Sequence, residues 1–139
     1  MTAVTSRRGA RRRAIDVLYQ SDVTGSDPLV VLRGWRDADR EIPPFTAELV
    51  EGVSGSLAEV DAAIGQVSEG WTVERLAAVD RAILRVAAFE LLHRPDVPPA
   101  AAIDEAVDAA KELSTEDSGR FVNGVLGAIA RNPTLDEGS

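Results

Sequence analysis

The sequence predicts an all-α protein, a compact bundle of about seven helices in two packed helical subdomains. Apolar residues recur at steps of three and four through most of the chain, which is the period of one face of a helix. Aromatic residues make up only 4% of the chain, and its many small aliphatic residues favour close helix packing. No alternating apolar run bounded by turn residues indicates a strand. At 139 residues we expect one domain, divided near residue 70 into subdomains of about 7–69 and 71–132.

The first two helices are predicted from short apolar patterns and from the residues that end them. A helix over about 8–22 follows from the spacing of Ile15, Leu18 and Tyr19, with Gly25 just beyond it. Asp27 and Pro28 are typical of an N-cap followed by the first turn of a helix, which predicts a second, short helix over 29–35.

A long apolar stripe then runs over 49–67, after the break expected at Pro43 and Pro44. Gly52 and Gly55 are expected to divide it into two helices. Thr72 is a candidate cap for the next helix, over about 76–93, which is apolar on more than half of its circumference. We therefore expect this helix at the centre of the core.

Two further helices are predicted over 103–113 and 121–129, and the tail after Pro133 is expected to be disordered. Asn123 and Gly124 could form a hairpin turn, but the flanking apolar spacing favours a helix. Because glycine in a helix costs about 1 kcal/mol relative to alanine, we expect Gly124 to allow a close approach of another backbone.

Positive charge is concentrated at the start of an otherwise acidic chain. The chain has 15 basic and 23 acidic residues, and five of the basic ones precede the first carboxylate, Asp16; they are Arg7, Arg8, Arg11, Arg12 and Arg13. Cations at a helix N-terminus oppose the helix dipole, so this end either frays or has a bound anion. The guanidinium group suits phosphate and stacks on bases, which makes nucleic acid a candidate ligand, with a solvated arm as the alternative.

Several functional classes find no support in the sequence. There is no cysteine for a disulfide framework or a thiolate metal site, and we expect no metal and no cofactor. No apolar run approaches the roughly 20 residues of a membrane span, and no apolar stretch of a secretory signal follows the first charges. We therefore expect a cytoplasmic protein. The single histidine, His93, has no nucleophile motif near it, so we expect no catalytic residues.

Two groups of charged residues have both a plain and a functional interpretation. Acidic residues at helical spacing (Asp104, Glu105, Asp108 and Glu112) could support acid–base chemistry, but a solvated face helped by Lys111 is favoured. Asp80 and Arg81 lie inside the most apolar helix. Pairing of Asp80 with Arg81 or Arg75 is the plain interpretation, and a partner surface is the alternative.

At this point several segments, in their order and spacing, resemble the NusB family of bacterial transcription antitermination factors over nearly the full chain. The segments are the arginines near the start with Val17, Leu18 and Tyr19, then residues 79–91, 96–98, 102–111 and 117–126. The resemblance implies an all-helical, non-enzymatic protein. It also implies binding of boxA RNA from ribosomal RNA leader transcripts together with NusE, a small-subunit ribosomal protein. With other Nus factors and RNA polymerase, such a complex suppresses premature termination.

The resemblance also implies site residues. Those for RNA are Arg7, Arg8, Arg11, Arg12, Asp117, Arg120 and Phe121, with Phe121 either stacking on a base or belonging to the core. Asp80 and Arg81 match a family surface near NusE.

Two alternatives stay open beside this interpretation. A similar helical module forms the N-terminal part of some ribosomal RNA cytosine methyltransferases, in which it would supply RNA contacts without methyl transfer. Some relatives self-associate as homodimers and cover their RNA surface, so a homodimer is also possible here.

Overall fold

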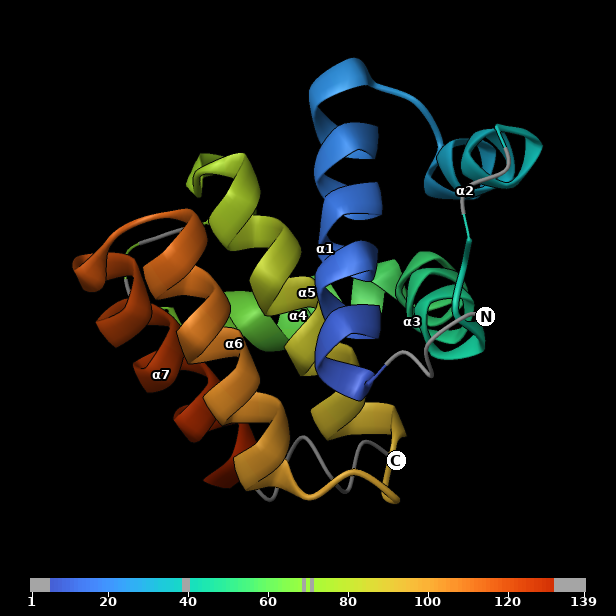
Figure 1. The fold of residues 1–139 in the computed structure, drawn as a ribbon. Helices are drawn as coiled ribbons and strands as arrows, with labels where there is room; N and C mark the ends of the chain where they lie inside the picture. Colours follow the sequence, from blue (N-terminus) through green and yellow to red (C-terminus); the bar gives the residue numbers. More distant parts are fainter. Residues whose placement is uncertain (1–5, 39–40, 69, 71, 132–139) are drawn as a thin grey trace.

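The structure is a computed structural model that describes residues 6–38, 41–68, 70 and 72–131, and Figure 1 shows its fold. The described residues contain seven α-helices and one 3₁₀ turn, with no strand. The elements are α1 (Arg7–Thr24), α2 (Pro28–Asp37), α3 (Pro44–Gly55), α4 (Leu57–Val67), η1 (Val73–Arg75), α5 (Ala78–His93), α6 (Pro99–Leu113) and α7 (Glu116–Arg131). The all-α prediction is confirmed. Residue 71 and the tail after Pro133 lie outside the described residues.

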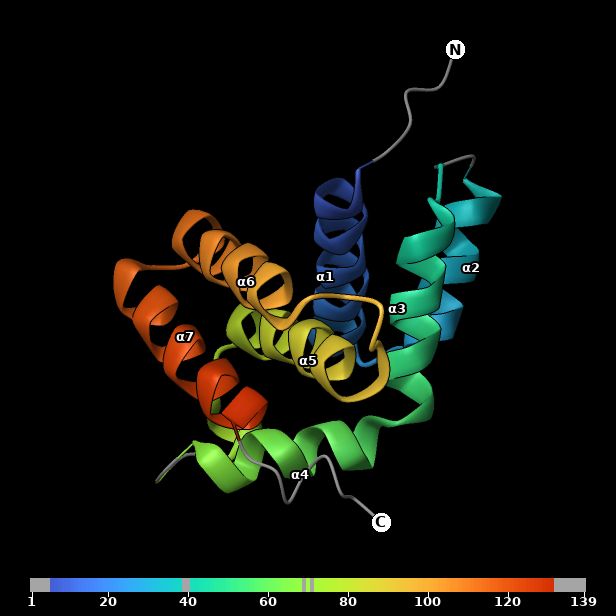
Figure 2. The same cartoon turned by 90° about the horizontal axis from the view of Figure 1, so that it is seen from below.

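Helix α5 is the centre of the bundle, as its apolar circumference predicts. It packs against α1, α3, α4, α6 and α7. Figure 2 shows α2 and α3 on one side of α1, and α6 and α7 on the other. One apolar cluster includes residues from all seven helices, and Ile83, Leu84 and Ala88 of α5 have no exposed surface. The division near residue 70 therefore does not separate the core, and the two subdomains stay a prediction.

Side chains and glycine end several helices where the sequence suggests. Asp27 accepts a hydrogen bond from the Leu29 backbone N–H at 2.7 Å, as an N-cap should, and Gly25 ends α1 in the left-handed region at φ 75°. Ser6 accepts a bond from the Gly9 N–H at 3.1 Å and so caps α1. The prediction for Thr72 was wrong in detail, because Thr72 precedes only η1 and makes no side-chain capping bond.

The glycine with a packing role is Gly52. A Cβ atom there would collide with the Phe89 ring, so the absence of a side chain lets α3 approach α5. The same expectation for Gly124 was wrong. Gly124 is exposed on α7, and a Cβ atom at this position would have no neighbour within 4 Å. The helical interpretation of this segment is confirmed, since α7 continues through both Asn123 and Gly124.

None of the helices described combines the length and the apolar character that a membrane span requires.

Candidate nucleic-acid interface

Four of the five arginines at the start of α1 are held by carboxylates of the same chain. This resolves the choice between a frayed helix end and a bound anion. The helix begins at Arg7, and acidic side chains from α5, from α6 and from the loop after α5 supply the anions. Their negative charge offsets the unfavourable interaction of the arginines with the helix dipole. The charge pattern alone therefore does not require an external polyanion.

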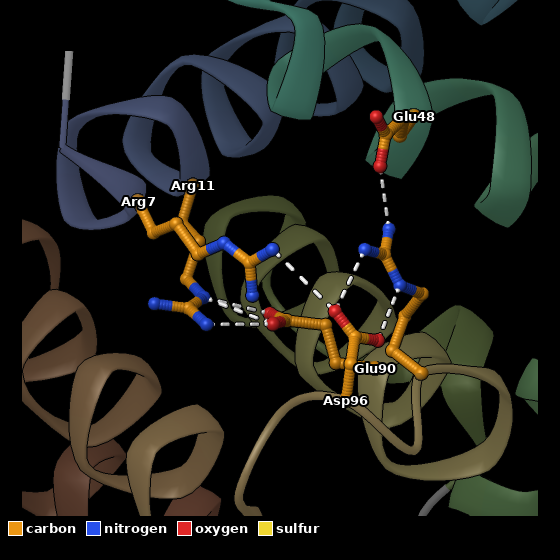
Figure 3. Close-up of polar contacts among 6 residues, drawn as sticks. Arg7, Arg11, Glu48, Glu90 and Asp96 are labelled. Atoms are coloured by element: carbon orange, nitrogen blue, oxygen red, sulfur yellow. Dashed lines mark hydrogen bonds and ion pairs between the residues drawn. The ribbon is translucent and has the colours of Figure 1, made fainter. Parts of the chain in front are cut away.

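Arg7 belongs to an ion-pair network at the exposed edge of α1 (Figure 3). Its Nη2 lies 3.4 Å from Asp96 Oδ2, and its guanidinium carbon lies 4.3 Å from the centre of the Phe45 ring. Arg94 donates to both oxygens of Asp96 at 2.9 and 3.0 Å, and to Glu48 at 2.6 Å. The hydrogen bond from Arg94 is the main cause that lowers the pKa of Asp96 to about 2. The same bond raises the pKa of Arg94.

Arg8 and Arg12 face three carboxylates of α6, which we call the α6 acidic face: Glu105, Asp108 and Glu112. Nη1 of Arg8 lies 3.1 Å from Glu105 and 3.3 Å from Asp108, and its Nη2 lies 3.2 Å from Glu112. Nη1 of Arg12 donates to the other oxygen of Glu112 at 2.9 Å. These carboxylates are ion-pair partners across two helices. The side chains of Asp108 and Glu112 stay more than half exposed, so the favoured interpretation of a solvated face holds, with the arginines of α1 as additional partners.

The pKa shifts of Arg8 and Glu112 follow from the same contacts. The hydrogen bond with Asp108 is the largest cause that raises the pKa of Arg8, followed by the charge of Glu105. The hydrogen bond from Arg12 is the largest cause that lowers the pKa of Glu112. The α6 acidic face therefore places three carboxylates against two guanidinium groups.

Arg11 differs from its neighbours because it is buried. Its Nε donates to both oxygens of Glu90, at 3.0 and 2.9 Å, and its Nη2 donates to Oε1 at 2.8 Å (Figure 3). Arg11 is 7% exposed and Glu90 is 1% exposed. This pair holds the start of α1 on the end of α5, and the Arg11 guanidinium is not presented to solvent.

The last arginine of the cluster, Arg13, has a backbone partner. It donates to the backbone carbonyl of Glu41 at 3.2 Å.

The sequence interpretation missed Glu90, although a signal was present. Glu90 comes four residues after Val86, so a carboxylate occupies a position on the apolar stripe of α5. A buried carboxylate needs a cationic partner, and an arginine is well suited to that role.

A second group of predicted residues meets at the start of α7. A pocket of about 400 Å³ is lined by Arg75, Leu76, Ala77, Asp80, Asp117, Ser118 and Phe121. It brings Asp80, Asp117 and Phe121 together, from α5 and α7. Phe121 packs against the core and also lines this pocket, so stacking of its ring on a base stays a prediction. Arg120 lies outside the lining and is ion-paired with Asp117.

Asp80 does not pair with Arg81 or Arg75, so the favoured interpretation of this residue was wrong. Its Oδ2 accepts a hydrogen bond from the Ser118 hydroxyl at 3.0 Å, and its buried Oδ1 has no hydrogen-bond partner among the described residues. Asp80 also lines the pocket, so its carboxylate contributes a negative charge to that surface.

Arg81 makes contacts within the chain. Its Nε donates to Asp22 of α1 at 2.7 Å, and its Nη1 donates to the backbone carbonyls of Val73, Glu74 and Leu76 at 3.0, 3.2 and 3.0 Å. It therefore fixes η1 and the end of α1 to the start of α5.

The arginines of α1 and the pocket at α7 form two separate groups. Helix α6 lies between α1 and α7 in both Figure 1 and Figure 2, so the two basic helix starts are not side by side. No group of three or more acidic or histidine side chains within the described ranges is arranged to hold a metal ion. The structure thus has carboxylate-paired arginines at one place and a pocket with charged, polar and aromatic residues at another.

Comparison with known proteins assigns this helical bundle to a class of transcription factors. The profile of the NusB family matches residues 8–131. The transcription antitermination protein NusB of Saccharopolyspora erythraea is 52% identical over 129 residues, which cover 90% of this chain and 86% of that protein. The corresponding protein of Rubrobacter xylanophilus is 48% identical over 121 residues, or 87% of each chain. The chain belongs to the NusB family.

Solved structures agree with this assignment. A structure of T. maritima NusB superposes with a TM-score of 0.83 at 32% identity, covering 97% of this chain and 99% of that one. A crystal structure of the antitermination factors NusB and NusE in complex with dsRNA contains a chain with a TM-score of 0.80 at 29% identity. The match covers 90% of this chain and 96% of that chain.

Proposed function

We propose that this protein is a transcription antitermination factor that binds boxA RNA together with NusE and acts with other Nus factors and RNA polymerase to suppress premature termination. The observation that carries the proposal is the likeness, over 90% of this chain, to a solved chain from a complex of NusB, NusE and dsRNA. Membership of the NusB family supports the same role. The protein acts by binding and not by catalysis, and it works in the cytoplasm, where RNA polymerase transcribes ribosomal operons.

For the RNA contact we propose the exposed arginines of α1 and the pocket at α7. Arg7 and Arg8 have solvent-accessible guanidinium groups that can exchange a carboxylate for a phosphate, whereas Arg12 is more buried, at 24% side-chain exposure with its Nη2 inside the protein. Asp117, Arg120 and Phe121 supply polar groups and an aromatic ring at the pocket, which suits an unpaired base. We assign Arg11 to the support of α1, because its guanidinium is buried against Glu90.

For NusE we propose Asp80 as a contact, with Arg81 as the residue that positions it. The position of Asp80 in the lining of the pocket supports the first role. The bonds of Arg81 to Asp22 and to three backbone carbonyls support the second.

A salt-dependent titration tests the RNA contact. Labelled boxA RNA is titrated with the wild-type protein and with the Arg7→Ala/Arg8→Ala variant, with and without NusE, at several salt concentrations. Loss of two phosphate contacts should weaken binding and make the plot of log K against log salt shallower by about 1–2. Light scattering on the same samples reports whether a homodimer covers the RNA surface.

The Arg33→Ala/Arg36→Ala variant is a matched control, since it removes two exposed cations from α2. Equal losses in the two variants, or no loss in the first, would reject the proposed role of the α1 arginines.

A further inference from the structure

The α6 acidic face and the α1 arginines form a contact that RNA must displace. The guanidinium nitrogens of Arg8 lie 3.1–3.3 Å from carboxylate oxygens of Glu105, Asp108 and Glu112. Nη1 of Arg12 lies 2.9 Å from the other oxygen of Glu112. A phosphate that binds these guanidinium groups needs the same N–H donors. The two kinds of anion therefore compete for the same hydrogen bonds.

The contact is exposed enough to be exchanged. The side chain of Arg8 is 43% exposed, and those of Asp108 and Glu112 are 51% and 55% exposed, whereas Glu105 and Arg12 are more buried, at 26% and 24%. Exposed ion pairs of this kind are weak and are screened by salt. The buried pair of Arg11 and Glu90, only 9% and 1% exposed at the side chains, holds α1 in place independently. Arg8 can therefore change partners, and Glu112 can leave Nη1 of Arg12, without the helix leaving the bundle.

The charge balance favours rejection of weakly bound polyanions. Three carboxylates face two guanidinium groups, so the surface carries a net negative charge when the arginines are paired. In addition, α6 lies between α1 and α7 (Figure 2), so an RNA strand that reaches from the α1 arginines to the pocket passes this helix. An RNA that also binds in the pocket gains free energy there, which offsets the loss of the arginine–carboxylate ion pairs. An RNA that contacts only the arginines has no such compensation.

We propose that the α6 acidic face is a built-in competitor for RNA, which holds Arg8 and Arg12 in the free protein and raises selectivity against RNAs that lack the pocket contacts. This inference rests on the proposed function, in that the α1 arginines bind RNA phosphates. It adds an autoinhibitory role for Glu105, Asp108 and Glu112.

The test compares RNA binding by Glu112→Gln and Asp108→Asn with binding by Asp104→Asn. Asp104 lies one turn before Asp108 on the same exposed helix face, and it forms no ion pair with any described residue. All three variants remove one negative charge. The probes are boxA RNA and a scrambled single-stranded RNA of equal length and composition.

At low salt, Glu112→Gln and Asp108→Asn should bind the scrambled RNA about two- to fivefold more tightly than the wild type. The gain for boxA RNA should be smaller, so the ratio of the two affinities falls. Asp104→Asn should change either affinity by less than these variants do. Thermal unfolding of each variant checks that the fold is retained.

A double-mutant comparison separates competition from simple repulsion of RNA. In an Arg8→Ala/Arg12→Ala background, Glu112→Gln should no longer strengthen binding, because no arginine remains to be released. A gain that persists there, or an equal gain from Asp104→Asn, would overturn the inference while leaving the RNA-binding proposal intact. If neither the wild type nor Glu112→Gln binds boxA RNA with or without NusE, the proposed function itself fails.

Discussion

The Arg11 guanidinium and the Glu90 carboxylate form a buried ion pair between α1 and α5, with three N···O distances of 2.8–3.0 Å. The two residues are 79 positions apart in the chain. This pair fixes the orientation of α1, on which all the other arginines of the cluster depend. It also explains why one arginine of a basic cluster is directed inward.

Removal of one partner of this pair should destabilise the fold strongly. Arg11→Ala or Glu90→Ala leaves a buried charge without a partner, and each should lower the free energy of unfolding by about 3–5 kcal/mol. Urea unfolding measures the change. The double variant Arg11→Met/Glu90→Met should lose much less than the sum of the single variants, because no unpaired charge remains. Strictly additive losses would contradict the pairing.

A side chain at Gly52 should also be costly. Gly52→Ala places a methyl group against the Phe89 ring, and overpacking of this kind costs about 1–3 kcal/mol. Gly65 is the control, because it lies inside α4 with open space where a Cβ atom would be added. Gly65→Ala should stabilise the protein by about 0.5–1 kcal/mol through helix propensity. Thermal unfolding of both variants checks the opposite signs.

The ion pair of Asp96 should contribute to acid sensitivity. Its pKa is lowered from 3.8 to about 2 in the folded protein, so the ionised carboxylate stabilises the fold above pH 4. This stabilisation is lost as the pH falls from about 4 to about 2, where the folded state takes up the proton. Asp96→Asn should therefore show a shallower loss of stability across this window in urea titrations at fixed pH. Asp104→Asn, without an ion pair to any described residue, should follow the wild type.

The ring of Phe121 should contribute to RNA affinity if it stacks on a base. Phe121→Leu keeps an apolar side chain at the edge of the core but removes the aromatic face, and it should weaken binding of boxA RNA by about 1–3 kcal/mol. Fluorescence titration measures the affinity, and urea unfolding separates it from any change in stability. Unchanged RNA affinity would assign Phe121 to the core alone.

Asp80 should affect NusE more than RNA. Asp80→Lys reverses the charge at the pocket, and it should abolish capture of NusE in a pull-down, while Asp80→Asn should weaken capture less. Ser118→Ala is the control, because it removes the hydrogen bond to Asp80 at 3.0 Å without a change of charge. Capture of NusE by Asp80→Lys at the wild-type level would exclude Asp80 from the contact.

Much of the fold could be predicted because it depends on local signals. Apolar spacing, Asp27 with Pro28, and Gly25 mark helices and their ends within a few residues. The role of Gly124 could not be predicted in this way, because the packing of a glycine depends on which helix lies opposite. Gly52 has Phe89 opposite it, whereas Gly124 faces solvent.

The candidate site was less predictable, because its contacts join distant parts of the chain. Arg8 and Glu112 are 104 positions apart, so sequence spacing alone gave no indication that they form a pair. The arginine cluster therefore suggested an exposed basic arm, while the structure surrounds it with carboxylates. Family resemblance identified the pocket residues Asp80, Asp117 and Phe121 as site candidates. It did not indicate that Oδ1 of Asp80 lacks a hydrogen-bond partner among the described residues.

The carbonyl contacts of Arg81 have a consequence for how a partner is received. By binding the backbone of Val73, Glu74 and Leu76, Arg81 sets the conformation of the segment that forms one wall of the pocket. That wall is already ordered in the free protein, so association there loses little conformational entropy. If the proposed partner docks at this place, we accordingly expect rigid-body recognition and not folding upon binding.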